Sequence, residues 1–225
     1  MVIGQELEAL IAAFILLLFS FIAHKKGLLS TPGILLACAV GLMAFMAGGF
    51  LPFIALVVFY IVAETATNLA REKETRHEQR TYTNILGNSG AAIIALFLGS
   101  PIAFFGAVSA ALSDTISSEI GMLSQKKPIL ITTLERVPKG TDGGITLLGV
   151  IAAFLGAAIM GAFYYLAFGG IAASAIIVGA GIIGSVVDSI LGAVFERKGS
   201  LDNTHVNFLA SCAGALFAAI AYALI

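Results

Sequence analysis

Acidic residues interrupt long hydrophobic runs of this sequence, where an uncompensated charge is costly. A carboxylate near the centre of a bilayer costs about 2.5–3.5 kcal/mol on insertion scales, so such residues usually serve a pathway, a proton relay or a ligand. Clustered carboxylate and hydroxyl oxygens without His or Cys favour a hard cation such as Mg²⁺. Residues 113–119 read Ser-Asp-Thr-Ile-Ser-Ser-Glu, a dense set of such oxygens in an apolar run. The four acids within or near these runs are Glu64, Asp114, Glu119 and Asp188.

Each of these polar groups also has a structural interpretation. Charges at helix ends can extend into the membrane interface, which suits Glu64 because Arg71 is near it in sequence. Serine and threonine hydroxyls can join neighbouring helices by hydrogen bonds, which explains Ser109 and Ser117. Neither explanation accounts for three acids, which we expect to converge on one face.

A glycine-rich segment over 136–146 reads Arg-Val-Pro-Lys-Gly-Thr-Asp-Gly-Gly-Ile-Thr and leads into an apolar run. Gly140 and Gly143 permit close backbone approach, and the free N–H groups of a helix start attract anions. Lys139 adds a positive charge. The segment resembles a phosphate cradle in composition but lacks the P-loop order. The alternative is a flexible turn with Asp142 as a helix N-cap.

Two further polar groups precede apolar runs. Arg80, Asn84 and Asn88 are spaced four apart, so they would form one stripe of a helix, and an Arg fork recognises phosphate. The alternative for the charged part, 71–80, is a solvated loop touching anionic headgroups. Residues 202–207 read Asp-Asn-Thr-His-Val-Asn, which indicates a polar recognition surface more than a metal site.

Composition places all of these groups in a membrane protein. The chain has 225 residues, of which 59% are hydrophobic and 11% charged, with 12 Lys+Arg, 13 Asp+Glu and a net charge of -1. A soluble domain carries about 25% charged residues. This excludes a water-soluble globule and a disordered chain, and gives no reason to expect a nucleic-acid partner. Cys38 and Cys212 lie in apolar runs, so no disulfide framework is expected. We expect residues 1–225 to form a single integral-membrane catalytic domain.

The fold class predicted is all-α, a polytopic membrane bundle of about eight helices. A spanning helix needs about 20 apolar residues. The predicted spans are 6–24, 31–47, 50–69, 84–99, 101–123, 143–168, 170–195 and 207–224. The first differs from a signal peptide, because Glu6 and Glu8 replace the usual basic start.

The basic residues predict the orientation. All 12 Lys and Arg fall after the first, third, fifth and seventh spans, on one face of an eight-span bundle. The positive-inside rule makes this face cytoplasmic, so both termini are expected outside. The opposite connections, 48–50, 99–101 and 168–170, are Gly/Pro turns. The cytoplasmic face therefore combines acids for a cation, glycines and bases for phosphate, and a hydrophobic bundle for a lipid tail. This set predicts phosphoryl transfer to a membrane-embedded substrate.

The ordered motifs resemble an integral-membrane family that includes plant phytyl-phosphate kinase of the vitamin E pathway and transmembrane protein nineteen. Residues 80–90 are similar to its Arg-x-x-x-Gln-Val-x-Ala-Asn-x-Gly block, with Asn84 in place of Gln and Gly87 in place of Ala. Residues 114–121 are similar to its Asp-Thr-x-x-Ser-Glu-x-Gly block, and 140–144 to its Gly-Thr-Asp-Gly-Gly loop. The C-terminal blocks resemble 188–192, 202–203 and Asn207.

The resemblance implies a membrane kinase that converts an isoprenoid monophosphate (phytyl, geranylgeranyl or polyprenyl) into the diphosphate. It implies a nucleoside triphosphate donor, CTP by analogy, and Mg²⁺. Asp114, Glu119 and Asp188 would hold the metal or orient phosphates, with Asp142 as a further catalytic acid. The implied phosphate-binding residues are Arg80, Asn84, Asn88, Lys139, Gly140, Thr141, Gly143, Asn203 and Asn207.

Two other classes of protein share part of this pattern. An ion-coupled transporter also carries intramembrane acids and Gly-rich broken helices, but should show repeat symmetry and acids at the midplane. A CDP-alcohol phosphotransferase carries a D-x-x-D-G-x-x-A-R signature that no segment here fits. Small residues such as Gly156, Ala157 and Gly161 suit packing within one chain or between two, so a monomer and a homo-oligomer both remain open.

Overall fold

A computed structural model describes residues 2–74 and 82–225, and within them the chain forms eight α-helices. They are α1 (Val2–Lys26), α2 (Thr31–Gly48), α3 (Phe50–Glu74), α4 (Tyr82–Phe97), α5 (Pro101–Met122), α6 (Leu147–Phe168), α7 (Ile171–Val194) and α8 (Asn203–Ala223). The remaining elements are strands β1 (Ile129–Leu130) and β2 (Gly144–Ile145) and the short 3-10 helix η1 (Glu196–Lys198). The predicted all-α bundle is confirmed.

Several helices begin elsewhere than predicted, and for α6 and α8 the reason is a polar cap. α6 starts at Leu147 instead of 143, because Gly144 pairs with Leu130 in a small antiparallel sheet. The N-cap of α6 is Thr146, whose hydroxyl accepts a hydrogen bond from the Gly149 N–H at 3.0 Å. α8 starts one turn before its predicted residue 207, because Asp202 caps it by accepting from the His205 N–H at 3.0 Å.

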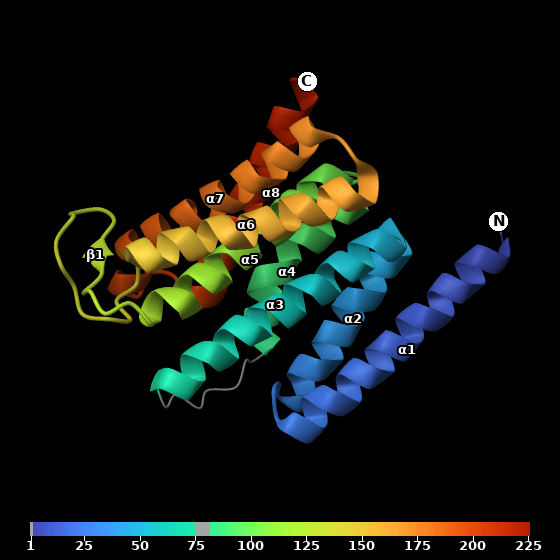
Figure 1. The fold of residues 1–225 in the computed structure, drawn as a ribbon, viewed down its shortest axis with the longest axis horizontal. Coiled ribbons are helices and arrows are strands. Elements are labelled where there is room, and N and C mark those ends of the chain that lie inside the picture. Colours follow the sequence, from blue (N-terminus) through green and yellow to red (C-terminus); the bar gives the residue numbers. More distant parts are fainter. Residues whose placement is uncertain (1, 75–81) are drawn as a thin grey trace.

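The helices run up and down, and both termini lie at the end of the bundle away from the β1 hairpin (Figure 1). Within the described ranges, six helices are long and apolar enough to cross a membrane: α1, α2, α3, α6, α7 and α8. Of the other two, α4 has 16 residues and α5 carries the polar run 113–119. α5 is largely buried inside the bundle, whereas α4 packs against α2, α5 and α8 and leaves Leu86 and Ile94 exposed.

The core is built around α5, which packs against α3, α4, α6, α7 and α8. Small residues allow this close approach, as is usual between membrane helices. A Cβ built on Gly184 of α7 would overlap the Cβ of Ala110 on α5. A Cβ on Gly106 of α5 would lie 2.7 Å from the carbonyl oxygen of Gly214 on α8. The backbones of α5, α7 and α8 are therefore in near contact.

The outermost helix is α1, which lies at the edge of the bundle beside α2 (Figure 1). Of its described side chains, residues 4–26, only Ala12 and Ala23 are buried. Its contacts include an edge-to-face ring pair between Phe19 and Tyr60, with centroids 4.9 Å apart. The N-terminal helix is therefore packed far less tightly than the α5 core.

Candidate functional site

Two intramembrane acids meet at one end of the core. The carboxyl groups of Asp114 on α5 and Asp188 on α7 are hydrogen-bonding neighbours. Their approach follows from the Gly184–Ala110 contact, because each acid lies four residues, about one turn, beyond a member of that contact. Oδ2 of Asp188 is buried and accepts no hydrogen bond from any donor in the described part of the chain. Two carboxyl groups so placed must share a proton or a cation, because both cannot stay ionised alone.

Two further acids lie within electrostatic range of this pair. The negative charge of Glu196 on η1 repels Asp114 and Asp188, and that of Asp142 repels Asp188 and Glu196. The Glu196 carboxylate also shares a side-chain hydrogen bond with Asn203. In the described residues no three His, Cys, Asp or Glu side chains are close enough together to hold a metal ion between them. Within the described residues, the acids in direct contact here are Asp114 and Asp188.

Glu196 is not among the acids that the sequence pattern predicts for the site. The sequence does contain one indication of its role: Glu196 follows the apolar span that carries Asp188 and lies about two helical turns beyond that residue. α7 ends at Val194, and η1 turns Glu196 back toward the pair. That turn is stabilised where Gly199 adopts φ 69° and its N–H donates to the Glu196 carbonyl at 2.8 Å.

The glycine loop packs on α7 immediately beyond Asp188. Gly143 adopts φ +75°, and a Cβ there would lie 2.5 Å from the Ser189 carbonyl oxygen and 2.6 Å from the Ala193 nitrogen. A Cβ on Gly192 would lie 3.1 Å from the Gly143 nitrogen. The predicted close backbone approach is therefore observed, against a helix of the same chain. It holds Asp142 beside the acid pair.

The loop is a defined turn rather than a flexible one. The Thr141 hydroxyl donates to the Pro138 carbonyl at 2.8 Å, and the Gly144 N–H donates to the Thr141 carbonyl at 2.9 Å. Gly140 adopts φ 78°, the left-handed conformation that glycine tolerates best. The alternative with Asp142 as N-cap is wrong, because Thr146 occupies that position.

Lys139 is exposed and ties the loop to α5. Its Nζ donates to the Met122 carbonyl at 2.9 Å. The last carbonyls of a helix carry partial negative charge, so a cation there is favoured. The ammonium group therefore lies at the C-terminal end of α5, the helix that carries Asp114.

The start of α8 connects the acids to α4. The Asn207 amide donates to Oδ1 of Asn203 at 3.2 Å, and Asn203 in turn contacts Glu196. A Cβ on Gly87 of α4 would lie 2.9 Å from the Thr204 carbonyl oxygen, so α4 and α8 touch there. The backbone N–H of His205 donates to Asp202 and holds the pKa of that exposed carboxyl below its usual value.

Asn84 and Asn88 lie on a different side of α4. Both line a cavity of about 320 Å³ between α1, α2, α3 and α4, together with mainly apolar side chains. Arg80, predicted on the same stripe, lies outside the described residues. The structure thus places these two asparagines beside an apolar space and away from the Asp114–Asp188 contact.

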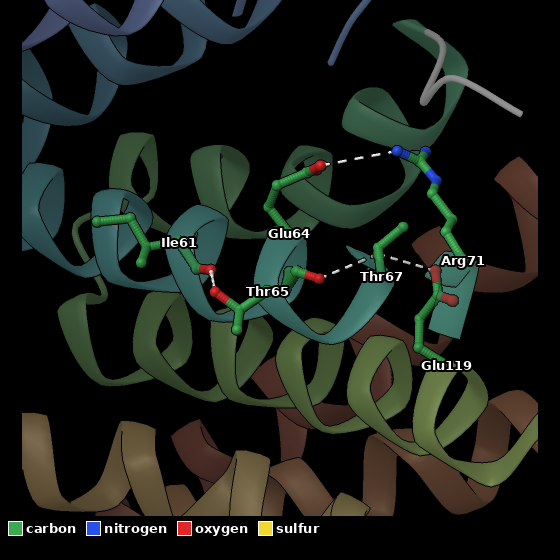
Figure 2. A network of polar contacts seen from close by, with 7 residues as sticks. Ile61, Glu64, Thr65, Thr67, Arg71 and Glu119 are labelled. Carbon is green, nitrogen blue, oxygen red and sulfur yellow. Dashed lines mark hydrogen bonds and ion pairs between the residues drawn. The ribbon is translucent and has the colours of Figure 1, made fainter. Parts of the chain in front are cut away.

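Glu119 faces α3 instead of α7. Its Oε1 accepts a hydrogen bond from the Thr67 hydroxyl at 2.9 Å, and Arg71 forms an ion pair with Glu64 at 3.7 Å on the same helix (Figure 2). Asp114 and Glu119 are five residues apart, which places them roughly 140° apart around a helix. Of the three acids expected on one face, Asp114 and Asp188 are therefore in contact, while Glu119 joins a separate network on α3.

Comparison with known proteins gives one family and several relatives. The family described as "Integral membrane protein DUF92" matches residues 14–215. An uncharacterized membrane protein of Methanocaldococcus jannaschii is 35% identical over 232 residues, covering 97% of this chain and 98% of its own length.

Two plant proteins are also similar. Protein PGR of Arabidopsis thaliana is 28% identical over 87% of this chain and 82% of its own length. Protein VTE6, chloroplastic, of the same plant is 30% identical over 84% of this chain, which spans 64% of that protein. Among solved structures, none matches the chain.

Proposed function

This chain belongs to the integral membrane protein DUF92 family, and we propose that it is a membrane kinase that phosphorylates an isoprenoid monophosphate to the diphosphate. The family assignment confirms the resemblance found in the sequence blocks, since VTE6 and PGR are among the relatives. The proposed donor is a nucleoside triphosphate, CTP by that resemblance.

The observation that carries the proposal is the contact between Asp114 and Asp188 beside the glycine loop. Mg²⁺ is usually held by one or two carboxylates, with waters and substrate phosphates completing its shell. A buried Asp188 oxygen without a donor in the described residues, next to a second carboxyl, fits such an ion. When bound, the metal would neutralise negative charge on the phosphates. Asp114 and Asp188 would hold it.

The proposed reaction needs positioning more than proton transfer. An oxygen of the isoprenoid monophosphate attacks the γ-phosphorus, a new P–O bond forms, and the bond to the β-phosphate oxygen breaks to release the nucleoside diphosphate. A phosphate monoester has a second pKa of about 6, so the nucleophile is already ionised near neutral pH. The acids are then free to bind a cation instead of acting as a general base.

Other side chains of the site would orient the phosphates. Lys139, at the end of α5, supplies positive charge next to the glycine loop. Asn203 and Asn207 supply amide groups on the side of Glu196. Asp142 and Glu196 add negative charge near the acid pair and would strengthen its attraction for a cation. By the positive-inside rule, we place this end of the bundle in the cytoplasm and both termini outside.

The test is a panel of nucleoside triphosphates and prenyl monophosphates with the purified protein and Mg²⁺, monitored for the prenyl diphosphate. Asp114→Asn should lower turnover by at least about a hundredfold, within the range for removing one electrostatic contact to a phosphoryl transition state. Glu8→Gln, an exposed residue of α1, is the matched control and should retain full activity. Absence of product with every nucleotide would refute the proposal.

The orientation has its own measurement. Cysteines placed singly in residues 196–207 should react with a membrane-impermeant maleimide in inside-out vesicles. Reaction only in right-side-out vesicles would place the site on the opposite face of the membrane.

A further inference from the structure

We propose that the cavity between α1, α2, α3 and α4 binds the hydrocarbon chain of the substrate, an inference that rests on the proposed function. The cavity measures about 320 Å³, inside the range of roughly 300–1,000 Å³ typical of ligand sites. Its lining includes Val108 of α5, the helix that carries Asp114, but neither Asp114 nor Asp188. The cavity would therefore take the chain and leave the phosphate to other residues of the site.

The shape and lining suit one extended apolar chain. α3 contributes residues from Phe53 to Ile61 and α1 from Ile15 to Ala23, each a stretch of about 12 Å along the helix axis. Half of a bilayer's hydrocarbon core is about 15 Å thick. The cavity thus extends along the helices for most of one leaflet. Its side chains are almost all aliphatic or aromatic.

Polar side chains of α4 form part of the cavity wall. Asn84, Asn88 and Ser89 of that helix line the cavity, and Asn84 lies near its start, at the end of the bundle that holds the acid pair. On α3, Glu64 follows one turn after the lining residues Tyr60 and Ile61, and is paired with Arg71 at 3.7 Å (Figure 2). An amphiphile would therefore bind with its headgroup toward this end and its chain toward the middle of the bilayer.

The volume favours a single chain over a two-chain phospholipid, because about 320 Å³ is near the lower limit for ligand sites. The wall formed by α1 also suits a ligand that enters from the membrane. α1 is held by few contacts, among them the Phe19–Tyr60 ring pair and a 3.1 Å contact between Ser20 and Cys38. The cavity is only partly enclosed, so a lipid chain could enter it without a large movement of this helix.

The first test maps the chain directly. A geranylgeranyl phosphate analogue with a photoreactive group at its far end is cross-linked to the wild-type protein, and the modified peptides are identified by mass spectrometry. Adducts are expected on lining residues of α1 and α3, such as Leu16 and Phe53. Adducts confined to the lipid-facing surfaces of α6 and α7 would overturn the proposal.

The second test fills the cavity. Ala37 of α2 lines it, whereas Leu35 on the same helix is 67% exposed. Ala37→Phe should weaken binding of geranylgeranyl phosphate about tenfold, as expected if the new ring displaces two methylene groups. Leu35→Phe, the matched control, should bind as wild type. Binding of dimethylallyl phosphate, which has one isoprene unit, should be unchanged by either substitution.

The outcomes separate this inference from the proposed function. If Ala37→Phe and Leu35→Phe bind geranylgeranyl phosphate equally well, the cavity is not the site of the chain. The same conclusion follows if added phospholipid suppresses the cross-linking as strongly as added prenyl phosphate does. If Ala37→Phe does not fold, Ala37→Leu and the wild-type cross-linking map decide the matter. Cross-links in the cavity without product from any nucleotide refute only the kinase. Product formation with cross-links elsewhere refutes only the site.

Discussion

Replacing Gly143 by alanine should detach the glycine loop from α7 and so test the geometry of the site. The residue has φ +75°, a conformation that costs an L-amino acid roughly 1–2 kcal/mol. Its new Cβ would also lie 2.5 Å from the Ser189 carbonyl oxygen and 2.6 Å from the Ala193 nitrogen. Both are backbone atoms of a helix, so they cannot move aside as a flexible side chain would. Overpacking of this kind costs typically about 1–3 kcal/mol.

The structure offers a control that separates the two costs. Gly199 has φ +69°, but a Cβ there would meet no atom within 4 Å. Gly199→Ala should therefore lose only the conformational part, about 1–2 kcal/mol, while Gly143→Ala should lose about 2–5 kcal/mol. Gly192→Ala, with its nearest contact at 3.1 Å, should fall between wild type and Gly143→Ala.

The assay is thermal unfolding of the three purified variants in detergent, followed by prenyl diphosphate formation below the unfolding transition. Gly143→Ala should also lose activity when folded, because the loop holds Asp142 beside the acid pair. A Gly143→Ala protein as stable and active as Gly199→Ala would refute the loop contact with α7.

Three further substitutions test other parts of the structure. Asp188→Asn should leave the metal-free protein about as stable as wild type, because the amide takes the place of the shared proton as donor to the Asp114 carboxyl group, while a Mg²⁺-dependent rise in melting temperature disappears; a metal-free variant much less stable than wild type would contradict this. Gly184→Leu should unfold the bundle or separate α5 from α7, since even a Cβ would overlap Ala110, and circular dichroism at rising temperature measures the loss. Asp202→Ala removes the α8 cap and should lower the free energy of unfolding, and this loss of stability relative to wild type should become smaller below about pH 4. The sign follows because a carboxyl whose pKa is lowered by folding contributes stability above its unfolded pKa and loses it as the pH falls; a deficit independent of pH would argue against the charged cap.

Hydrophobic length and turn residues predicted most of the fold. The spans 31–47, 101–123 and 170–195 agree with α2, α5 and α7 within one residue at either end. The errors fall where polar side chains build structure. Residues 143–146 became a strand and a cap, and residues 203–206 became the first turn of α8. Hydropathy cannot detect either, because caps and hairpins depend on single hydrogen bonds rather than on average apolarity.

The site was predicted in part. Asp114 and Asp188 were both recognised from their cost in an apolar span, but nothing in the sequence fixes which helix each one faces. The separation of Glu119 depends on the rotation of α5 between α3 and α7, which small-residue packing determines. To predict the position of Glu196, one must know that α7 ends at Val194 and that the chain turns back there. To predict the cavity, one must know where α1 packs, and α1 has too few buried residues to give a sequence pattern.

The contact between Gly184 and Ala110 also gives the site a mechanical property. Gly184 is the point at which α7 touches α5. Along α7, Asp188 lies about 6 Å from Gly184 in one direction, and Ile171 lies about 20 Å from it in the other. If a change in bilayer thickness tilted these two helices about that contact, the carboxyl groups would move roughly three times less than the far end of α7. The spacing of the two acids would then depend little on the composition of the membrane.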